Sequence, residues 1–244
     1  MKRIKHDFLH ESGTILLSCL ILSISIGFQN CAPSPAGSME VSRGSTIALL
    51  GNNLCSRMMN YGHFETMLHL RFPDSTLVVR NMCDGGDTPG FRPHSGRVSP
   101  WAFPGAERFQ SELTKNSGSQ GHFETPDDWL TRLQADIIIA CFGYNESFEG
   151  LTGLQSFKEE LTAFVLHTKE QKYDGSVSPK LVLVSPIAYE DLSVQFDLPN
   201  GKVENEHLNI YMEAMREVAD SHEVHFVDAF TPSSQWFERS AEAL

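Results

Sequence analysis

Positive charge is scarce in this sequence of 244 residues. Nineteen lysine and arginine residues stand against 31 aspartate and glutamate residues, which gives a formal net charge of -12. No run of lysine or arginine offsets that balance locally. Proteins that hold a nucleic acid need a basic patch to face its phosphates, so the composition argues against nucleic acid as a partner.

Cysteine is scarce as well, and the few cysteines are not spaced like metal ligands. Of the five, Cys19 and Cys31 lie near the N-terminus, and Cys55, Cys83 and Cys141 lie in the body of the chain. That odd remainder does not indicate a disulfide framework. Zinc sites pair cysteines or histidines at short, regular spacings, whereas here both residue types are scattered. We therefore expect neither a metal nor a cofactor.

The N-terminal segment has the order of a secretory signal. Lys2, Arg3 and Lys5 precede an apolar run over residues 14–28, and small residues follow at 34–36. Basic, apolar and small residues in that order are typical of exported proteins. The apolar run is shorter than the ~20 residues that span a membrane, so no membrane span is expected once the signal is removed.

This pattern predicts the limits of the N-terminal segments. Residues 1–36 are expected to form the signal peptide and residues 37–45 a linker, and the protein is expected to be exported to the periplasm or the extracellular space. A lipid anchor at Cys31 is the competing interpretation. It is disfavoured because small residues are expected just before a lipid-bearing cysteine, whereas positions 28–30 are Phe-Gln-Asn.

Short apolar runs alternate with amphipathic stretches along the rest of the chain. The runs predict buried strands at residues 46–51, 77–79, 137–140, 181–184 and 224–227. Helices are predicted between them at residues 54–71, 154–171 and 204–220, and another begins where Thr125 precedes Pro126. Such alternation indicates a parallel sheet covered on both faces. We expect an α/β fold of three layers, with a doubly wound, five-stranded sheet in the flavodoxin-like order 2-1-3-4-5 and strand one central.

Polar loops follow the first three predicted strands. Gly51-Asn52-Asn53 comes after the first, Asp84-Gly85-Gly86-Asp87 after the second, and Gly143-Tyr144-Asn145-Glu146 after the third. Any one of these loops is explained equally well by glycine and asparagine turning the chain. Three of them at neighbouring strand ends favour a ligand site, because ligands of doubly wound sheets bind outside the carboxyl ends of the strands.

In order and placement these loops resemble the sequence blocks of the SGNH (GDSL-type) hydrolases. The first loop is similar to the family's Gly-Asp-Ser block and places Asn53 where the family has its serine nucleophile. The segment 81–87 is similar to the second block and places Gly86 at the oxyanion-hole glycine. The third loop is similar to the Gly-x-Asn-Asp block and places Asn145 at the second oxyanion donor. The resemblance runs from about residue 46 to 232 and implies the SGNH hydrolase fold.

Two parts of that family's machinery are missing. Acyl transfer needs a nucleophile activated by a base, and donors aimed at the developing oxyanion. Gly86, Asn145 and the backbone N–H of Asn53 can supply the donors, but an amide side chain is not a nucleophile at neutral pH. The family's Asp-x-x-His block lies beyond strand five, where this sequence has no histidine after His225. The domain, over residues 46–244, is therefore expected to be truncated before that block.

Other side chains near these loops offer alternative chemistry. Cys55 is either a displaced nucleophile or, as we favour, an ordinary small residue in a helical turn. Asp84, Asp87 and Glu146 can hold a metal or activate a water, although solvated loop carboxylates are the usual case. Asp228 follows strand five as a candidate acid or, in the simpler interpretation, ends the strand and caps the next helix.

Two functional hypotheses remain open. The family resemblance implies an ester hydrolase whose ligand is a small-molecule or carbohydrate ester, such as an O-acylated carbohydrate. The residues favour a non-catalytic module that keeps the pocket and binds a carbohydrate or an acyl group, with Asn52, Asp87 and Glu146 as binding residues. The stretches 142–147 and 185–188 also resemble a bacterial subgroup found at the N-terminal end of large exported proteins, which implies further domains on the C-terminal side.

Overall fold

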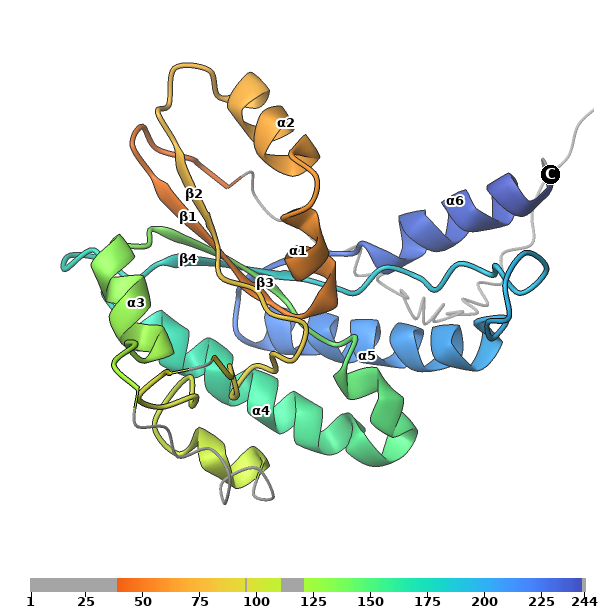
Figure 1. Ribbon diagram of the computed structural model, residues 1–244. Helices are drawn as coiled ribbons and strands as arrows, with labels where there is room; N and C mark the ends of the chain where they lie inside the picture. Colours follow the sequence, from red (N-terminus) through yellow and green to blue (C-terminus); the bar gives the residue numbers. More distant parts are fainter. Residues whose placement is uncertain (1–38, 95, 111–120, 243–244) are drawn as a thin grey trace, which may run out of the picture. The chain divides into compact units, whose positions relative to one another are not determined.

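The computed structural model of the chain describes residues 39–94, 96–110 and 121–242. They contain a sheet of five parallel strands in the order β2-β1-β3-β4-β5 (Figure 1), which confirms the expected flavodoxin-like order. Most of the predicted signal and linker, residues 1–38 with Cys19 and Cys31, lies outside the described residues. Within the described ranges, no helix has the length and apolar character needed to cross a membrane.

The strands lie within two residues of their predicted bounds. They are β1 (Thr46–Gly51), β2 (Val78–Asn81), β3 (Ile137–Cys141), β4 (Lys180–Val184) and β5 (His225–Val227). The middle position belongs to β3, so the prediction that strand one is central was wrong. The reason is that the chain adds two strands beyond β3 and only β2 beyond β1.

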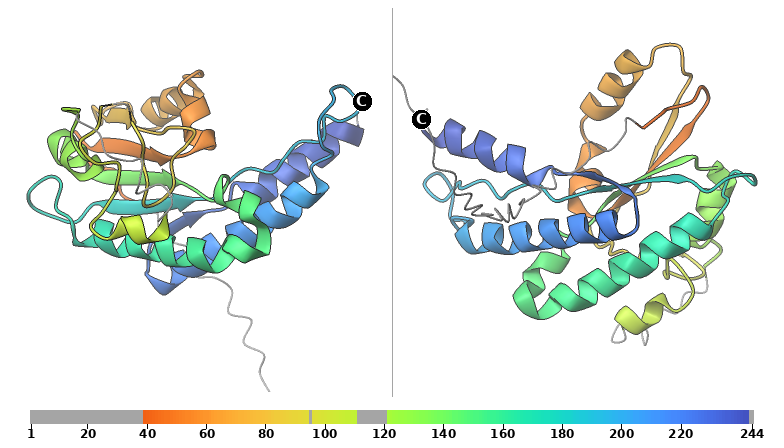
Figure 2. Two further views of the ribbon diagram at one scale, coloured as in Figure 1. Left: turned by 60° about the horizontal axis from the view of Figure 1, so that its bottom comes forward. Right: turned by 180° about the vertical axis from the view of Figure 1, so that it is seen from behind.

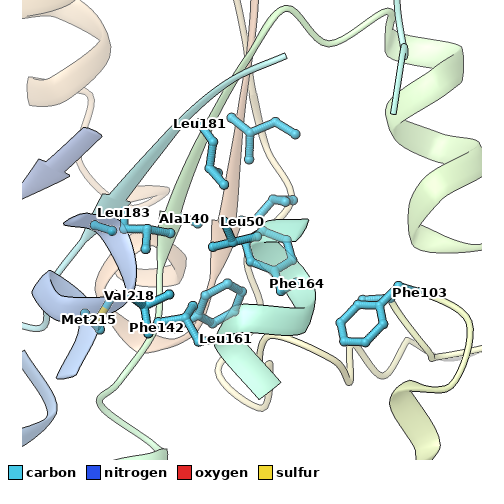
Figure 3. Packing of buried hydrophobic residues seen from close by; sticks show 14 of the residues in the cluster. Leu50, Phe103, Ala140, Phe142, Leu161, Phe164, Leu181, Leu183, Met215 and Val218 are labelled. Atoms are coloured by element: carbon cyan, nitrogen blue, oxygen red, sulfur yellow. The ribbon is translucent and has the colours of Figure 1, made fainter. Parts of the chain in front are cut away.

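Successive strand residues face opposite layers, as the pleat of a strand requires. One face, with Leu50, Ala140 and Leu183, is buried against α4 (Gly150–Glu170) and α5 (Lys202–Ser221) (Figure 3). The other face, with Leu49 and Cys141, packs under α1 (Asn53–Met58) and α2 (His63–Arg71). Figure 2 shows the sheet between these two pairs of helices. The three-layer arrangement is therefore confirmed.

The helices follow their sequence signals with one interruption. Thr125 begins α3 (Pro126–Leu133) as predicted, because its hydroxyl accepts a hydrogen bond from the Asp128 N–H at 3.2 Å. The apolar stripe predicted on α4 is buried, at Phe157, Leu161, Phe164 and Val165. The helix predicted over 54–71 is divided into α1 and α2 by a turn at residues 59–62. The chain ends in α6 (Phe230–Glu242), whose Phe237 packs near the start of α5.

The segment between β2 and α3 is anchored on α4. Its residues Ala102, Phe103 and Ala106 belong to the core cluster that α4 completes, and Ala106–Phe109 forms a short 3-10 helix, η1. The buried carboxylate of Glu160 accepts hydrogen bonds from Gly90 N at 2.8 Å and Thr88 Oγ1 at 2.7 Å. Burial raises the pKa of Glu160. The side chain of Glu160 on α4 therefore fixes the loop at residues 88–90 to that helix.

A disulfide bond joins Cys55 to Cys83, with a Cα–Cα distance of 5.8 Å. This corrects the expectation from the odd cysteine count, because the two residues lie 28 positions apart and only the pairing of β1 with β2 brings them together. Cys141 is a free, buried thiol. Neither interpretation kept for Cys55 describes it: it is no free nucleophile, and it is more than a small packing residue.

Removal of this disulfide should destabilise the fold. A bridge that closes a loop of this length contributes roughly 3 kcal/mol by restricting the unfolded chain. We expect the Cys55→Ser/Cys83→Ser variant to lose about that much free energy of unfolding in urea titrations. Equal stability of variant and wild type, or a free thiol at Cys55 in peptide maps of the unreduced protein, would contradict the bond.

Candidate functional site

The carboxyl edge of the sheet is shaped by a close contact between β1 and β3. Gly51 has a φ of +129°, and a Cβ added to it would lie 2.0 Å from the carbonyl oxygen of Cys141. Only glycine tolerates that approach and that backbone conformation. The next residue, Asn52, donates its N–H to the same carbonyl oxygen at 3.0 Å. The loop after β1 therefore turns directly against the end of β3.

Asn53 and Asn145 come together at this edge. Asn53 Nδ2 donates a hydrogen bond to Asn145 Oδ1 at 3.3 Å. Asn145 Nδ2 donates to the carbonyl oxygens of Gly85 at 2.8 Å and Asp87 at 3.2 Å. An amide nitrogen carries two protons, so both N–H groups of Asn145 are used within the protein. Its role as an oxyanion donor stays a prediction.

Gly85 is the glycine that contacts both asparagines, and the oxyanion-hole role of its neighbour Gly86 stays a prediction. Its carbonyl oxygen accepts from Asn145, and a Cβ added to it would lie 3.2 Å from Asn53 Oδ1. Gly86 N donates to Asp84 Oδ1 at 3.2 Å, on the exposed side of the loop. Two adjacent glycines fit the sequence block equally well, and only the three-dimensional contact separates them.

Asn52 and Glu146 link the first and third loops below the surface. Asn52 Nδ2 and Gly143 N both donate to Glu146 Oε2, at 3.2 and 2.8 Å. Glu146 Oε1 is buried and has no hydrogen-bond partner among the described residues. The residue keeps some exposed surface, but its carboxyl group is buried, and burial raises the pKa of Glu146 to about 8. Burial therefore favours the protonated form of this carboxyl group.

Asp87 is buried beside the same loop, with 1% of its surface exposed. Burial raises the pKa of Asp87 to about 7, while the charge of Arg92 opposes that rise. Arg92 is itself buried, and its guanidinium lies 5.3 Å from the ring centre of Phe164. Asn52 is equally buried. The predicted binding roles of Asn52, Asp87 and Glu146 stay predictions, since these side chains lie behind the surface.

No general base meets the two asparagines within the described ranges. The partners of the Asn53 and Asn145 side chains are amide and carbonyl groups, not imidazoles. His167 pairs with Asp127 at 2.6 Å. It lies in the last turn of α4, about 25 Å along the helix axis from the first turn, which is the end of the helix that follows Asn145 in the chain.

Asp228 is engaged at the start of α6, and the loop carboxylates gather into no metal-binding group among the described residues. Asp228 Oδ1 accepts the Thr231 N–H at 2.9 Å, and its other oxygen lies 3.1 Å from Arg216 Nη2. It therefore serves the start of α6, as in the simpler interpretation. The described part of the chain contains no group of three histidine, cysteine, aspartate or glutamate side chains that could hold a metal ion, so Asp84, Asp87 and Glu146 form no such group.

Two cavities lie at this edge, beyond the ends of β3, β4 and β5. The smaller, of about 200 Å³, is lined by Tyr144, Ser147, Phe148, Tyr189, Val203, Glu204, His207 and Leu208. The larger, of about 480 Å³, lies between the loop after β4 and α6, and Tyr189 borders both. The sequence interpretation missed both cavities, because apart from Tyr144 and Ser147 their walls come from segments that carry no motif.

Comparison with known proteins finds structural likeness only. No protein-family model and no curated protein matches this sequence. BT4096, a gut microbial diltiazem-metabolizing enzyme, is 17% identical with a TM-score of 0.52, over 81% of this chain and 39% of that one. A catalytic mutant of Axe2, an acetylxylan esterase from Geobacillus stearothermophilus, is 14% identical with a TM-score of 0.50, over 82% and 83%. A GDSL-like lipase from Parabacteroides merdae is 13% identical with a TM-score of 0.47, over 77% and 78%.

At such identities the likeness concerns the fold. This chain spans less than half the length of BT4096 and most of the length of Axe2. The match to Axe2 covers 82% of this chain, and the strand order is the flavodoxin-like one that the sequence pattern predicted. The chain therefore has the SGNH/GDSL hydrolase-type fold.

Proposed function

We propose that this chain is an SGNH-type domain that does not hydrolyse esters and instead binds a carbohydrate or an acyl group at its carboxyl edge. The hydrogen bond between Asn53 and Asn145 is the observation that carries the proposal. It places two amides at the positions of the nucleophile and of an oxyanion donor, and Asn145 in turn donates both of its N–H groups to the carbonyl oxygens of Gly85 and Asp87. Neither amide can attack an ester.

The groups that could substitute for the missing serine support the same proposal. Cys55 is bonded to Cys83, so its sulfur is not available as a thiolate. Asp87 and Glu146 are buried carboxyl groups with raised pKa values, held by internal hydrogen bonds. The disulfide also supports the proposed export, because such bonds persist in oxidising compartments.

The smaller cavity supports a binding role. The rings of Tyr144 and Phe148 meet edge to face at 5.4 Å, and Phe148 is 68% exposed. Glu204 and His207 line the same cavity and offer hydrogen-bonding groups. An exposed aromatic face beside polar groups suits a sugar ring, which has both apolar and hydroxyl-bearing sides. Because Axe2 is an acetylxylan esterase, an acetylated xylo-oligosaccharide is the first ligand to test.

Substitution of Phe148 should weaken that binding. We expect the wild type to bind acetylated xylo-oligosaccharide in calorimetric titrations without releasing acetate, and Phe148→Ala to bind about tenfold more weakly after losing a stacking face. Phe196→Ala is the matched control, since Phe196 is also exposed but lines neither cavity. Equal losses in both variants, or no binding by the wild type, would refute the carbohydrate role.

Ester turnover should be absent. Loss of the nucleophile from a serine triad lowers kcat about a millionfold. We expect initial rates on p-nitrophenyl acetate to equal the buffer rate for the wild type and for Asn53→Ser, because a serine there would have no imidazole beside it to accept its proton. Wild-type turnover that disappears in Asn145→Ala would show that a different mechanism operates. Circular dichroism of each variant checks the fold.

Stability should fall as the pH rises toward 8. Above about pH 4.5 the unfolded chain loses a proton that the folded chain keeps on Glu146, whose pKa of about 8 is raised by burial, so the free energy of unfolding decreases. Between about pH 5 and pH 8 the wild type should lose roughly 3 kcal/mol more than Glu146→Gln, which keeps the acceptor oxygen without the ionisation. Urea titrations at both pH values measure this. Parallel pH profiles would mean that the carboxyl group is solvated.

A further inference from the structure

The larger cavity at the carboxyl edge has the size of a ligand site. Its volume of about 480 Å³ falls within the range of small-molecule pockets. It lies between the loop at residues 189–200 and the part of α6 that begins at Ser234. Its apolar walls are Tyr189, Leu192, Val194 and Phe237.

The two aromatic walls are held in place from behind. Tyr189 and Phe237 pack against the buried cluster of Ala188, Leu208, Met212 and Phe230. The main chain at Tyr189 is fixed by Asn205, whose Oδ1 accepts the Tyr189 N–H at 2.7 Å and whose Nδ2 donates to the Tyr189 carbonyl oxygen at 3.0 Å. The rings are therefore positioned before any ligand arrives, which lowers the entropy that binding would lose.

Negative charge surrounds these rings without a compensating cation in the lining. Glu190, Asp191 and Glu238 line the cavity, and no lysine or arginine is among the described residues that line it. The side-chain and backbone hydrogen bonds from Ser193 hold the pKa of Asp191 below its usual range, so it stays ionised. A ligand with a carboxylate or a phosphate would be repelled here.

We propose that this cavity binds an organic cation, that is, an amine or quaternary ammonium group attached to an apolar body. The faces of aromatic rings carry negative potential and attract cations placed over them. The carboxylates add attraction of the same sign, and Leu192 and Val194 accommodate the apolar body. A neutral sugar would gain affinity from contact with the rings but none from the carboxylates. This site is separate from the proposed carbohydrate site in the smaller cavity, although Tyr189 borders both.

Benzyltrimethylammonium and its uncharged carbon isostere, neopentylbenzene, test the charge preference in NMR titrations of the full chain. We expect the cation to bind at least about tenfold more tightly than the isostere and to weaken as salt is added. Phe237→Leu should lower the affinity for the cation about tenfold, because the leucine keeps apolar volume but removes the aromatic ring. Phe196→Leu, in the loop at residues 189–200 but outside the lining, should leave binding within about twofold.

A charge-neutralising pair keeps the test valid if Phe237→Leu disturbs packing. Glu190 and Asp191 are exposed, so Glu190→Gln/Asp191→Asn should fold normally and still bind the cation about tenfold more weakly. Asp197→Asn/Glu206→Gln removes two charges outside the lining and is the matched control. Equal affinity for the cation and the isostere would overturn the proposal, as would equal losses of affinity in the test and control pairs. It would also be overturned if a neutral xylo-oligosaccharide displaced the cation from the wild type and Phe237→Leu abolished that competition. Phe148→Ala should leave cation binding unchanged, which separates this site from the carbohydrate site.

Discussion

The close approach of Gly51 to Cys141 is the contact on which the carboxyl edge depends. Pairing of β1 with β3 continues to the last residue of each strand, because Gly51 has no Cβ to meet the Cys141 carbonyl. The loop after β1 is thereby pressed against the loop after β3. Asn52 can then reach Glu146, and Asn53 can reach Asn145. A side chain at position 51 would separate both pairs at once.

What this geometry assembles is a set of polar groups that satisfy one another. Catalytic sites keep a nucleophile and oxyanion donors available to the substrate, whereas here the Asn145 protons are donated to two carbonyl oxygens and Asn53 donates to Asn145. Buried polar groups are stabilising only when they are paired. The two loop carboxyl oxygens left unpaired, Asp87 Oδ1 and Glu146 Oε1, belong to groups whose burial favours the protonated form. These hydrogen bonds hold the three loops together, and under the proposed function the cavities beside them are where a ligand binds.

The fold could be predicted from the sequence because it depends on local patterns. Apolar runs of strand length can be recognised without knowing which segments are neighbours in space. The same holds for the helical spacing of Phe157, Leu161 and Phe164. The features that the sequence did not predict all depend on which segments of the chain come into contact. The bond between Cys55 and Cys83 depends on the pairing of β1 with β2.

The candidate site divides in the same way. Asn53 and Asn145 could be placed together because both follow neighbouring strands, and the structure brings them into contact. Which of the adjacent glycines, Gly85 or Gly86, contacts the two asparagines cannot be read from the sequence, because the two residues are identical. The cavities beside Tyr189 depend on how the loop after β4 packs against α5 and α6, which no local sequence pattern indicates.

Covalent labelling tests most directly whether the edge can activate a nucleophile. A fluorophosphonate reacts with a serine only where a base and oxyanion donors prepare it. The chain carrying Asn53→Ser should be incubated with such a probe, and its intact mass compared with that of the wild type. We expect no adduct on either protein, because the groups around position 53 are engaged with each other. A stoichiometric adduct at position 53 would show that a working base and oxyanion hole are present, and would contradict the account.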